Sequence, residues 1–278
     1  MRWASRLAGV AVAIFAVYFV INFQPLYERV KLDRSYPALS RYVFEPTPNV
    51  VIVGSSKSFR MYEGYFKTPL RNLSIGGGSA ATSLAIIDSY RSIPSLILVE
   101  TNILSRPIDK QLVDAFGANP SEPYQWFKPA RAVISWLYYW IKYKSEAENV
   151  KRLPLLRPET YDIRENVDAT ITEYARTDWE AYMRPNVPGL AKLVQQLQSR
   201  GCRVVFFELP TVPELRENAY VRVAHRLAHE AFPDQSRWLE LSDHELRWFD
   251  SYHFDERSAI LVARQIDNHL SAGGGRSN

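Results

Sequence analysis

The feature that most constrains the fold is a set of short apolar runs that recur along the chain. Residues 96–99 read Leu-Ile-Leu-Val, with no polar residue to face water on either side of a strand. Such a strand is buried on both faces, as in the centre of a parallel sheet. The other strand candidates are Val50–Val53, Leu73–Ile75, Arg203–Glu208 and Trp238–Leu241. Helical patterns alternate with these runs, which predicts an α/β domain whose parallel five-stranded sheet is covered on both faces.

Helical spacing is found in four segments, and these set the limits of the domain. The segments are Ala80–Arg91, Val187–Ser199, Glu214–Ala231 and Glu256–Leu270. We therefore expect the domain to span residues 48–270, followed by a Gly-rich, disordered tail at 271–278. Residues 107–165 break the alternation, are rich in proline and are interpreted as an insertion. Its aromatic segment, Ala132–Lys144, is expected to pack on the core, and a lid or a surface for a membrane or partner is the alternative.

The N-terminus carries the longest apolar run. Leu7–Phe23 has 17 residues and follows Arg2 and Arg6. A helix of this length reaches roughly 26 Å, enough for a bilayer core. We therefore predict an uncleaved membrane anchor at residues 1–23 and a polar connector at 24–47. A cleaved signal peptide is the alternative, but its apolar region is normally shorter and ends in small residues. Basic residues flank the run on both sides, so the charge rule gives no orientation.

Composition argues against several other classes of function. The net charge is only +4 and no block of like charges occurs, so no nucleic-acid partner is expected. The single cysteine, Cys202, cannot form an internal disulfide or a multi-cysteine zinc site, and its apolar neighbours indicate burial. His225 and His229 lie four residues apart on a predicted helix, before Glu230, and could bind a metal ion. No third ligand is evident in the sequence, so we expect no metal and no cofactor.

Two short motifs point to nucleophilic chemistry. Ser56 follows Gly54-Ser55 at the end of the first predicted strand, where a hydroxyl is presented at the carboxyl edge of the sheet. Asp250-Ser-Tyr-His253 lies near the last predicted helix. An aspartate three residues before a histidine can bind its Nδ1 and leave Nε2 free to accept a serine proton. Ser56, Asp250 and His253 are therefore candidates for a catalytic triad.

Two further segments are candidates for binding an oxyanion. The glycines Gly76–Gly78 follow the second predicted strand, and glycine lets backbone N–H groups approach a reacting oxygen closely. Asn102 follows the third predicted strand, where its side-chain amide can donate a hydrogen bond.

A dinucleotide-binding loop is the alternative interpretation of the glycine segment. Gly76, Gly78 and Ala81 fit the loose Gly-x-Gly-x-x-Ala pattern, and Glu100 lies at a plausible distance for a ribose contact. That loop normally follows the first strand of its domain, whereas this one follows the second. It also leaves the serine, aspartate and histidine unexplained, so the oxyanion interpretation is preferred.

The order serine, glycine, asparagine and Asp-x-x-His resembles the SGNH (GDSL-like) hydrolase superfamily, whose members are flavodoxin-like three-layer α/β proteins. The likeness covers about residues 48–106 and 185–270 and omits the insertion. It implies that Ser56 is the nucleophile and that Asp250 and His253 complete the triad. It also implies an oxyanion hole formed by Gly77, Asn102 and the backbone N–H of Ser56.

The chain departs from the family pattern at two places. Ser55 stands where the family has aspartate before the nucleophile. Residues 100–103 read Glu-Thr-Asn-Ile where the family has Gly-x-Asn-Asp. Asn102 is therefore the least firmly assigned of the site residues, and Gly76 or Gly78 can take the place of Gly77.

The resemblance implies a serine-dependent esterase or O-acyltransferase that acts on acyl esters, acetyl first, of cell-envelope or extracellular polysaccharide. Gly-Ser-Ser behind a single anchor looks like the envelope branch of the superfamily. This implies a single-pass protein of the inner (cytoplasmic) membrane, a catalytic domain outside the cytoplasm and a membrane-bound acyltransferase as partner. The alternative is a non-catalytic SGNH-fold scaffold or polysaccharide-binding protein.

Overall fold

Five parallel strands form one sheet in the order β2-β1-β3-β4-β5. The computed structural model describes residues 2–29, 35–119, 161–175 and 177–274, together with 135–137, 139–141, 148, 150–151 and 153. The strands are β1 (Val50–Val53), β2 (Arg71–Asn72), β3 (Leu96–Glu100), β4 (Arg203–Phe207) and β5 (Trp238–Leu239). The predicted parallel five-stranded sheet is confirmed, and its strand order is that of flavodoxin-like sheets.

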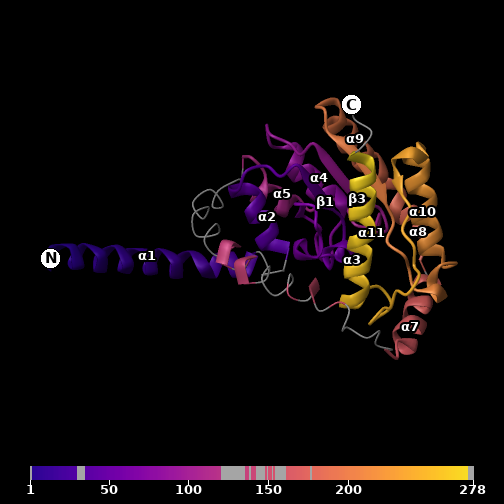
Figure 1. Cartoon of the computed structure of the whole chain (residues 1–278), viewed down its shortest axis with the longest axis horizontal. Coiled ribbons are helices and arrows are strands. Elements are labelled where there is room, and N and C mark those ends of the chain that lie inside the picture. Colours follow the sequence, from indigo (N-terminus) through magenta and orange to yellow (C-terminus); the bar gives the residue numbers. More distant parts are fainter. Residues whose placement is uncertain are drawn as a thin grey trace.

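Helices cover both faces of this sheet, because alternate side chains of the strands enter two separate hydrophobic clusters. Val51 and Phe206 belong to the cluster under α2, α4, α9 and α10. Ile52 and Phe207 belong to the cluster under α11, the yellow helix that lies across the sheet in Figure 1. The helices of the domain are α2 (Ser35–Phe44), α3 (Ser56–Phe59), α4 (Ala80–Asp88), α5 (Lys110–Phe116), α7 (Arg164–Ala175), α8 (Trp179–Met183), α9 (Val187–Ser199), α10 (Ala219–Ala231) and α11 (Glu256–Gly274).

The second strand lies earlier than its apolar residues predicted. The regular strand is β2, whereas Leu73–Ile75 was the expected segment. Leu73 and Ile75 nevertheless donate backbone hydrogen bonds to Ile52 and Gly54, at 2.8 and 3.0 Å. The chain therefore stays alongside β1 up to the glycine segment. The fifth strand is also shorter than expected and ends at Leu239 rather than Leu241.

Two predicted helix boundaries are corrected by the structure. The helix expected from Glu214 begins at Ala219, because the 3-10 turn η5 (Pro213–Leu215) precedes it and Asn218 caps its first turn. The predicted disordered tail is wrong for residues 271–274, since α11 continues to Gly274. Residues 275–278 of that tail lie outside the described residues.

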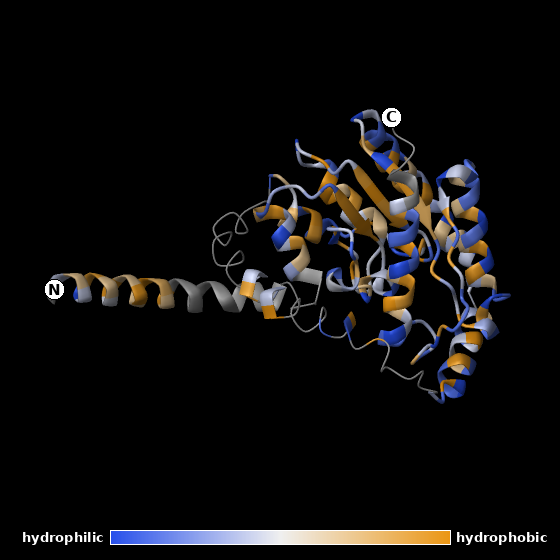
Figure 2. Cartoon of the chain, in the orientation of Figure 1, coloured by the Kyte–Doolittle hydropathy of each residue, from blue (hydrophilic) through white to orange (hydrophobic). Residues whose placement is uncertain are grey.

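The N-terminal segment is helical beyond the predicted anchor. Helix α1 spans Arg2–Arg29, and α2 occupies much of the rest of the expected connector at 24–47. Figures 1 and 2 show α1 extending away from the domain, with many hydrophobic residues along it. Among the helices that the structure describes, none is long and apolar enough to cross a membrane. The anchor at residues 1–23 stays a prediction.

The expected insertion at 107–165 is described only in part. Helix α5 lies near its start, and residues 135–137 and 139–141 of the aromatic segment are helical. The rest of Ala132–Lys144 lies outside the described residues. The side chains of Trp136, Leu137, Trp140 and Ile141 are exposed, so these four do not pack on the core as expected. Arg41 of α2 lies 3.1 Å from the ring of Tyr139.

A group of ion pairs fixes α2 against the edge of the sheet. Arg41 donates to Glu63 at 2.8 Å and to Glu45 at 2.9 Å, and Arg71 of β2 donates to Glu45 at 2.6 Å. Glu63 also accepts the backbone N–H of Asn72 at 3.1 Å. Both arginine side chains are buried, so each needs its carboxylate partners to offset lost hydration.

Replacing Glu63 tests this network. We expect Glu63→Gln to lower the free energy of unfolding by about 3 kcal/mol, because it leaves the buried guanidinium of Arg41 without one of its charged partners. Urea denaturation measures the change. Asp162→Asn removes a carboxylate from an exposed pair with Arg164 and should leave the midpoint unchanged. Equal midpoints for wild type and Glu63→Gln would contradict this account.

Candidate active site

The turn after β1 places Ser56 at the carboxyl edge of the sheet. Strand β1 ends at Val53, and Ser56 is the first residue of the short helix α3. Ser55 caps this helix, since its hydroxyl accepts the backbone N–H of Lys57 at 3.2 Å. Because β1 lies between β2 and β3, this edge is the switch point at which doubly wound sheets bind their ligands.

A buried carboxylate under the turn holds it in place. Glu100, at the end of β3, is only 2% exposed. Its Oε2 accepts from the Ser55 backbone N–H at 2.7 Å, from the Ser55 hydroxyl at 2.6 Å and from the Ser58 hydroxyl at 3.0 Å. Gly54 makes this approach possible, because a Cβ at that position would lie 2.6 Å from Oε2 of Glu100. Sequence reasoning missed this role of Glu100, although an acid directly after a fully apolar strand was a visible signal.

A second set of hydrogen bonds ties α3 to the neighbouring strand. The side-chain amide of Asn72 donates to the carbonyls of Ser58 and Met61 at 2.8 and 2.7 Å. Its oxygen accepts the backbone N–H of Ser74 at 2.9 Å, and the hydroxyls of Ser58 and Ser74 lie 2.8 Å apart. The nucleophile turn is therefore fixed from both β2 and β3.

The predicted serine, histidine and aspartate form one chain of hydrogen bonds. The Ser56 hydroxyl lies 3.1 Å from Nε2 of His253, and Nδ1 of His253 lies 2.8 Å from Oδ2 of Asp250. The loop between β5 and α11 carries both Asp250 and His253. It is closed by an antiparallel bridge between Trp248 and Phe254. The structure thus brings these three residues together from opposite ends of the domain.

The surroundings of Asp250 favour its ionised form. Burial raises the pKa of its carboxyl group, but hydrogen bonds from the His253 ring and from the backbone N–H groups of Tyr252 and His253 outweigh that effect. The pKa therefore lies below its ordinary value. Both backbone groups donate to Oδ1 at 2.7 Å. An ionised Asp250 accepts the Nδ1 proton of His253 and leaves the Nε2 lone pair directed at Ser56.

Two backbone N–H groups are candidates for stabilising an oxyanion. Ser56 is the first residue of α3, so its N–H has no partner within the helix. Gly77 has a φ of 70°, which favours glycine, and lines the same cavity as Ser56 and His253. Gly78 also lines that cavity, but its N–H donates to the carbonyl of Ile75 at 3.0 Å. The geometry therefore favours Gly77 over Gly78.

Asn102 is not brought to this cavity. Its amide donates to the carbonyl of Leu209 at 2.9 Å, and its oxygen accepts the N–H of Leu209 at 2.7 Å. This reciprocal pair joins the chain segments that follow β3 and β4. Asn102 lines a smaller neighbouring cavity together with Lys57. Its part in an oxyanion hole stays a prediction.

The dinucleotide interpretation of the glycine segment gains no support. Glu100, the residue it required for a ribose contact, is buried and binds Ser55 and Ser58 instead. Gly77 and Gly78 line the cavity that contains Ser56. The glycine segment therefore belongs to the same site as the predicted triad.

The cavity beside Ser56 has an aromatic wall that sequence reasoning missed. Its volume is about 470 Å³. The aromatic residues that line it are Tyr174 of α7, Trp179 and Tyr182 of α8, Tyr220 of α10, and Tyr252. The rings of Tyr174 and Tyr220 stack with their centroids 4.5 Å apart. Burial raises the pKa of Tyr220 to about 12, so its hydroxyl stays neutral. The recurrence of aromatic residues at 174–182 was the available signal.

Lys57 is a buried cation next to the nucleophile. It is 8% exposed, and its Nζ donates to the hydroxyl of Thr211 at 3.3 Å. Burial lowers the pKa of Lys57, although the charges of Glu100, Glu208 and Asp250 act in the opposite direction. Its positive charge lies among three carboxylates and thereby helps to offset the cost of burying them.

Glu100 offers a test of the turn. We expect Glu100→Gln to lower the free energy of unfolding by about 2–3 kcal/mol, since three hydrogen bonds to a buried charge are weakened together. It should also slow labelling of Ser56 by a fluorophosphonate roughly tenfold or more, because the hydroxyl loses its fixed position. Denaturation and labelling time courses measure the two effects. Glu240→Gln, at an exposed residue, should change neither. Unchanged labelling in a destabilised Glu100→Gln would limit Glu100 to a role in stability.

Comparison with known proteins leaves the chain without a family assignment. It matches no family model, and no curated protein matches it.

Proposed function

We propose that the chain is a serine-dependent esterase or O-acyltransferase of the SGNH type. The observation that carries the proposal is the hydrogen-bonded series Ser56–His253–Asp250 at the carboxyl edge of the sheet. The flavodoxin-like strand order supports it. The backbone N–H groups of Ser56 and Gly77, two residues that line the same cavity, support it as well. The lowered pKa of Asp250, which favours its ionised form, also supports the proposal.

The proposed reaction has two half-reactions, and His253 accepts and then donates one proton in each. Nε2 of His253 takes the proton of Ser56 as Oγ attacks the ester carbonyl, and Asp250 stabilises the imidazolium. The N–H groups of Ser56 and Gly77 stabilise the oxyanion of the tetrahedral intermediate. The intermediate collapses with loss of the alcohol, which receives the proton from His253. Water or a sugar hydroxyl then attacks the acyl-serine as His253 takes its proton. The second tetrahedral intermediate collapses with cleavage of the acyl–Oγ bond, and His253 returns the proton to Oγ of Ser56.

The aromatic cavity supports an acylated carbohydrate as substrate. Tyr182 and Trp179 present apolar ring faces, which can pack on the C–H face of a pyranose. Arg106, Glu173 and Thr177 line the same cavity and supply polar partners for hydroxyl groups. We therefore propose acyl esters, acetyl first, of cell-envelope or extracellular polysaccharide. An envelope location and a membrane-bound acyltransferase partner belong to the proposal through the resemblance alone.

A non-catalytic SGNH-fold scaffold or polysaccharide-binding protein is the second candidate. The observation that favours it is the orientation of Asn102, whose amide is paired with Leu209 instead of facing the cavity. Such a protein would keep the aromatic wall for binding and would have no need of a reactive serine. The two candidates therefore differ in whether Ser56 reacts.

Hydrolysis of p-nitrophenyl acetate by the full-length chain tests the triad. We expect Ser56→Ala and His253→Ala to lower kcat/KM by roughly 10³-fold or more, since each removes a group that acts in the chemical step. A fluorophosphonate should label wild type but not Ser56→Ala. His244→Ala, at an exposed histidine, is the matched control and should keep full activity. Folded wild type that is neither active nor labelled would overturn the enzyme and favour the scaffold.

Tyr182 tests the substrate class. Its side chain is 62% exposed and lines the cavity. We expect Tyr182→Ala to raise KM for an acetylated oligosaccharide roughly fivefold or more. This change corresponds to the loss of about 1 kcal/mol of binding energy from the contact between ring and sugar. KM for p-nitrophenyl acetate should stay unchanged, because that substrate is too small to span the cavity. Trp136→Ala, at a similarly exposed residue outside the cavity lining, is the control. Equal effects on both substrates would count against a carbohydrate.

A further inference from the structure

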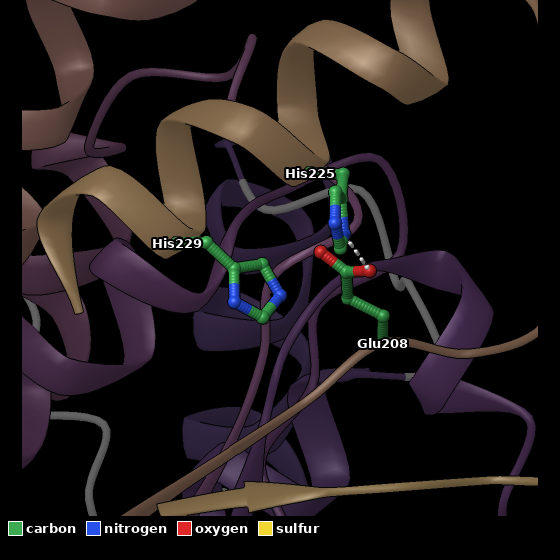
Figure 3. A group of neighbouring side chains, drawn as sticks. All are labelled: Glu208, His225 and His229. Carbon is green, nitrogen blue, oxygen red and sulfur yellow. Dashed lines mark hydrogen bonds and ion pairs between the residues drawn. The ribbon is translucent and has the colours of Figure 1, made fainter. Parts of the chain in front are cut away.

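A second group of polar side chains lies beyond the triad, where β4 meets α10. Glu208 directly follows β4, and His225 and His229 lie one helical turn apart on the face of α10 that overlies it (Figure 3). One potential ligand atom from each of the three lies within 4.8 Å of the others. In sequence the histidine pair had no evident third ligand, because Glu208 is 17 residues before His225.

We propose that Glu208, His225 and His229 bind a divalent transition-metal ion, with Zn²⁺ as the expected occupant. Two imidazoles and one carboxylate are a donor set that Zn²⁺ accepts in proteins. Histidines at positions i and i+4 of a helix present their rings on one face, as a shared ion requires. Three protein ligands leave a fourth position for water or another small ligand.

A simple ion pair does not account for this group. Glu208 Oε2 lies 2.8 Å from Nδ1 of His225, which satisfies one carboxylate oxygen. The other oxygen, Oε1, is buried and has no hydrogen-bond partner among the described residues. In Figure 3 the carboxylate lies beside both imidazole rings, whose centroids are 4.3 Å apart. A buried, unpaired carboxylate oxygen is costly, and an ion bound between the rings would satisfy it.

The ring of His229 is held in an orientation that suits ligation. It stacks on Trp238 with the ring centroids 3.8 Å apart, and its Nδ1 lies 3.1 Å from the side-chain amide of Gln235. With Nδ1 occupied by Gln235, Nε2 is the nitrogen turned toward Glu208 in Figure 3. The Gln235 atom at this distance is the amide nitrogen, so ligation through Nε2 of His229 requires the amide to turn over. Its oxygen then accepts an Nδ1 proton, and the Nε2 lone pair is directed to the ion.

Only a small rearrangement separates this geometry from a metal site. Bonds of about 2.0–2.1 Å in a tetrahedral site place neighbouring ligand atoms roughly 3.3 Å apart. The side chain of His225 is 57% exposed, so it can move with little loss of packing. Glu230, the acid next to His229 in sequence, is not the third ligand. It pairs with Arg226 at 2.8 Å, and a second arginine, Arg184, lies 3.8 Å away.

Binding of Zn²⁺ to the full-length chain, purified without a histidine tag, tests the proposal. Wild type and His244→Gln should bind one equivalent by calorimetry, and Zn²⁺ should raise their thermal midpoints. His225→Gln and Glu208→Gln should bind at least roughly tenfold more weakly and lose the thermal shift. Co²⁺ bound by wild type should give the visible absorption of a four-coordinate ion. None of these measurements depends on esterase activity, so the result is independent of the proposed function.

Two results would overturn the site. One is wild type that binds no stoichiometric Zn²⁺, and the other is His225→Gln that binds it as tightly as wild type. Thermal midpoints without metal show whether each variant is folded. Because His225 is exposed, His225→Gln gives a decisive answer even if Glu208→Gln is unstable.

Discussion

A single buried carboxylate at the end of the central strand determines where Ser56 lies. Glu100 receives three hydrogen bonds from the turn that carries Ser56, and Gly54 allows the turn to approach it. Burying an isolated carboxylate would cost several kcal/mol. The hydrogen bonds from the turn offset this cost, and the carboxylate in return holds the turn in place. Lys57 adds a buried positive charge close by. The strand end, the helix cap and the nucleophile therefore form one interdependent unit.

The rest of the site is built around this unit from three distant parts of the chain. The β2 edge supplies Gly77, and the loop before α11 supplies the histidine and aspartate. Helices α7, α8 and α10 supply the aromatic wall. Thr170 of α7 bonds to the hydroxyl of Ser251 at 2.9 Å, which connects the wall to the loop that carries His253. The aromatic wall and the loop that carries His253 are thus joined by a hydrogen bond.

The sequence was sufficient to predict those elements and contacts that depend on a local pattern of residues. Strands β1 and β3 and helix α9 follow from runs of apolar residues or helical spacing, and the spacing of Asp250 and His253 indicated their contact. It was insufficient where a residue depends on a distant partner. Strand β2 consists of arginine and asparagine, and no local apolar pattern marks it as a strand. Their partners, Glu45 and Ser58, lie elsewhere in the chain. Asn102 and Glu208 likewise take their surroundings from segments that no local pattern connects.

The two departures from the SGNH pattern, Ser55 and Glu100, contact each other. Where the family has aspartate in the turn and glycine at the strand end, this chain has a hydroxyl in the turn and a carboxylate at the strand end. The carboxylate of this contact therefore belongs to residue 100 here and to residue 55 in the family pattern. The proposed SGNH assignment implies an evolutionary path between the two arrangements, and this path must cross an intermediate with either two facing carboxylates or none. Residues 55 and 100 are therefore expected to change together among relatives of this chain, and either one alone is a poor guide to whether the turn is intact.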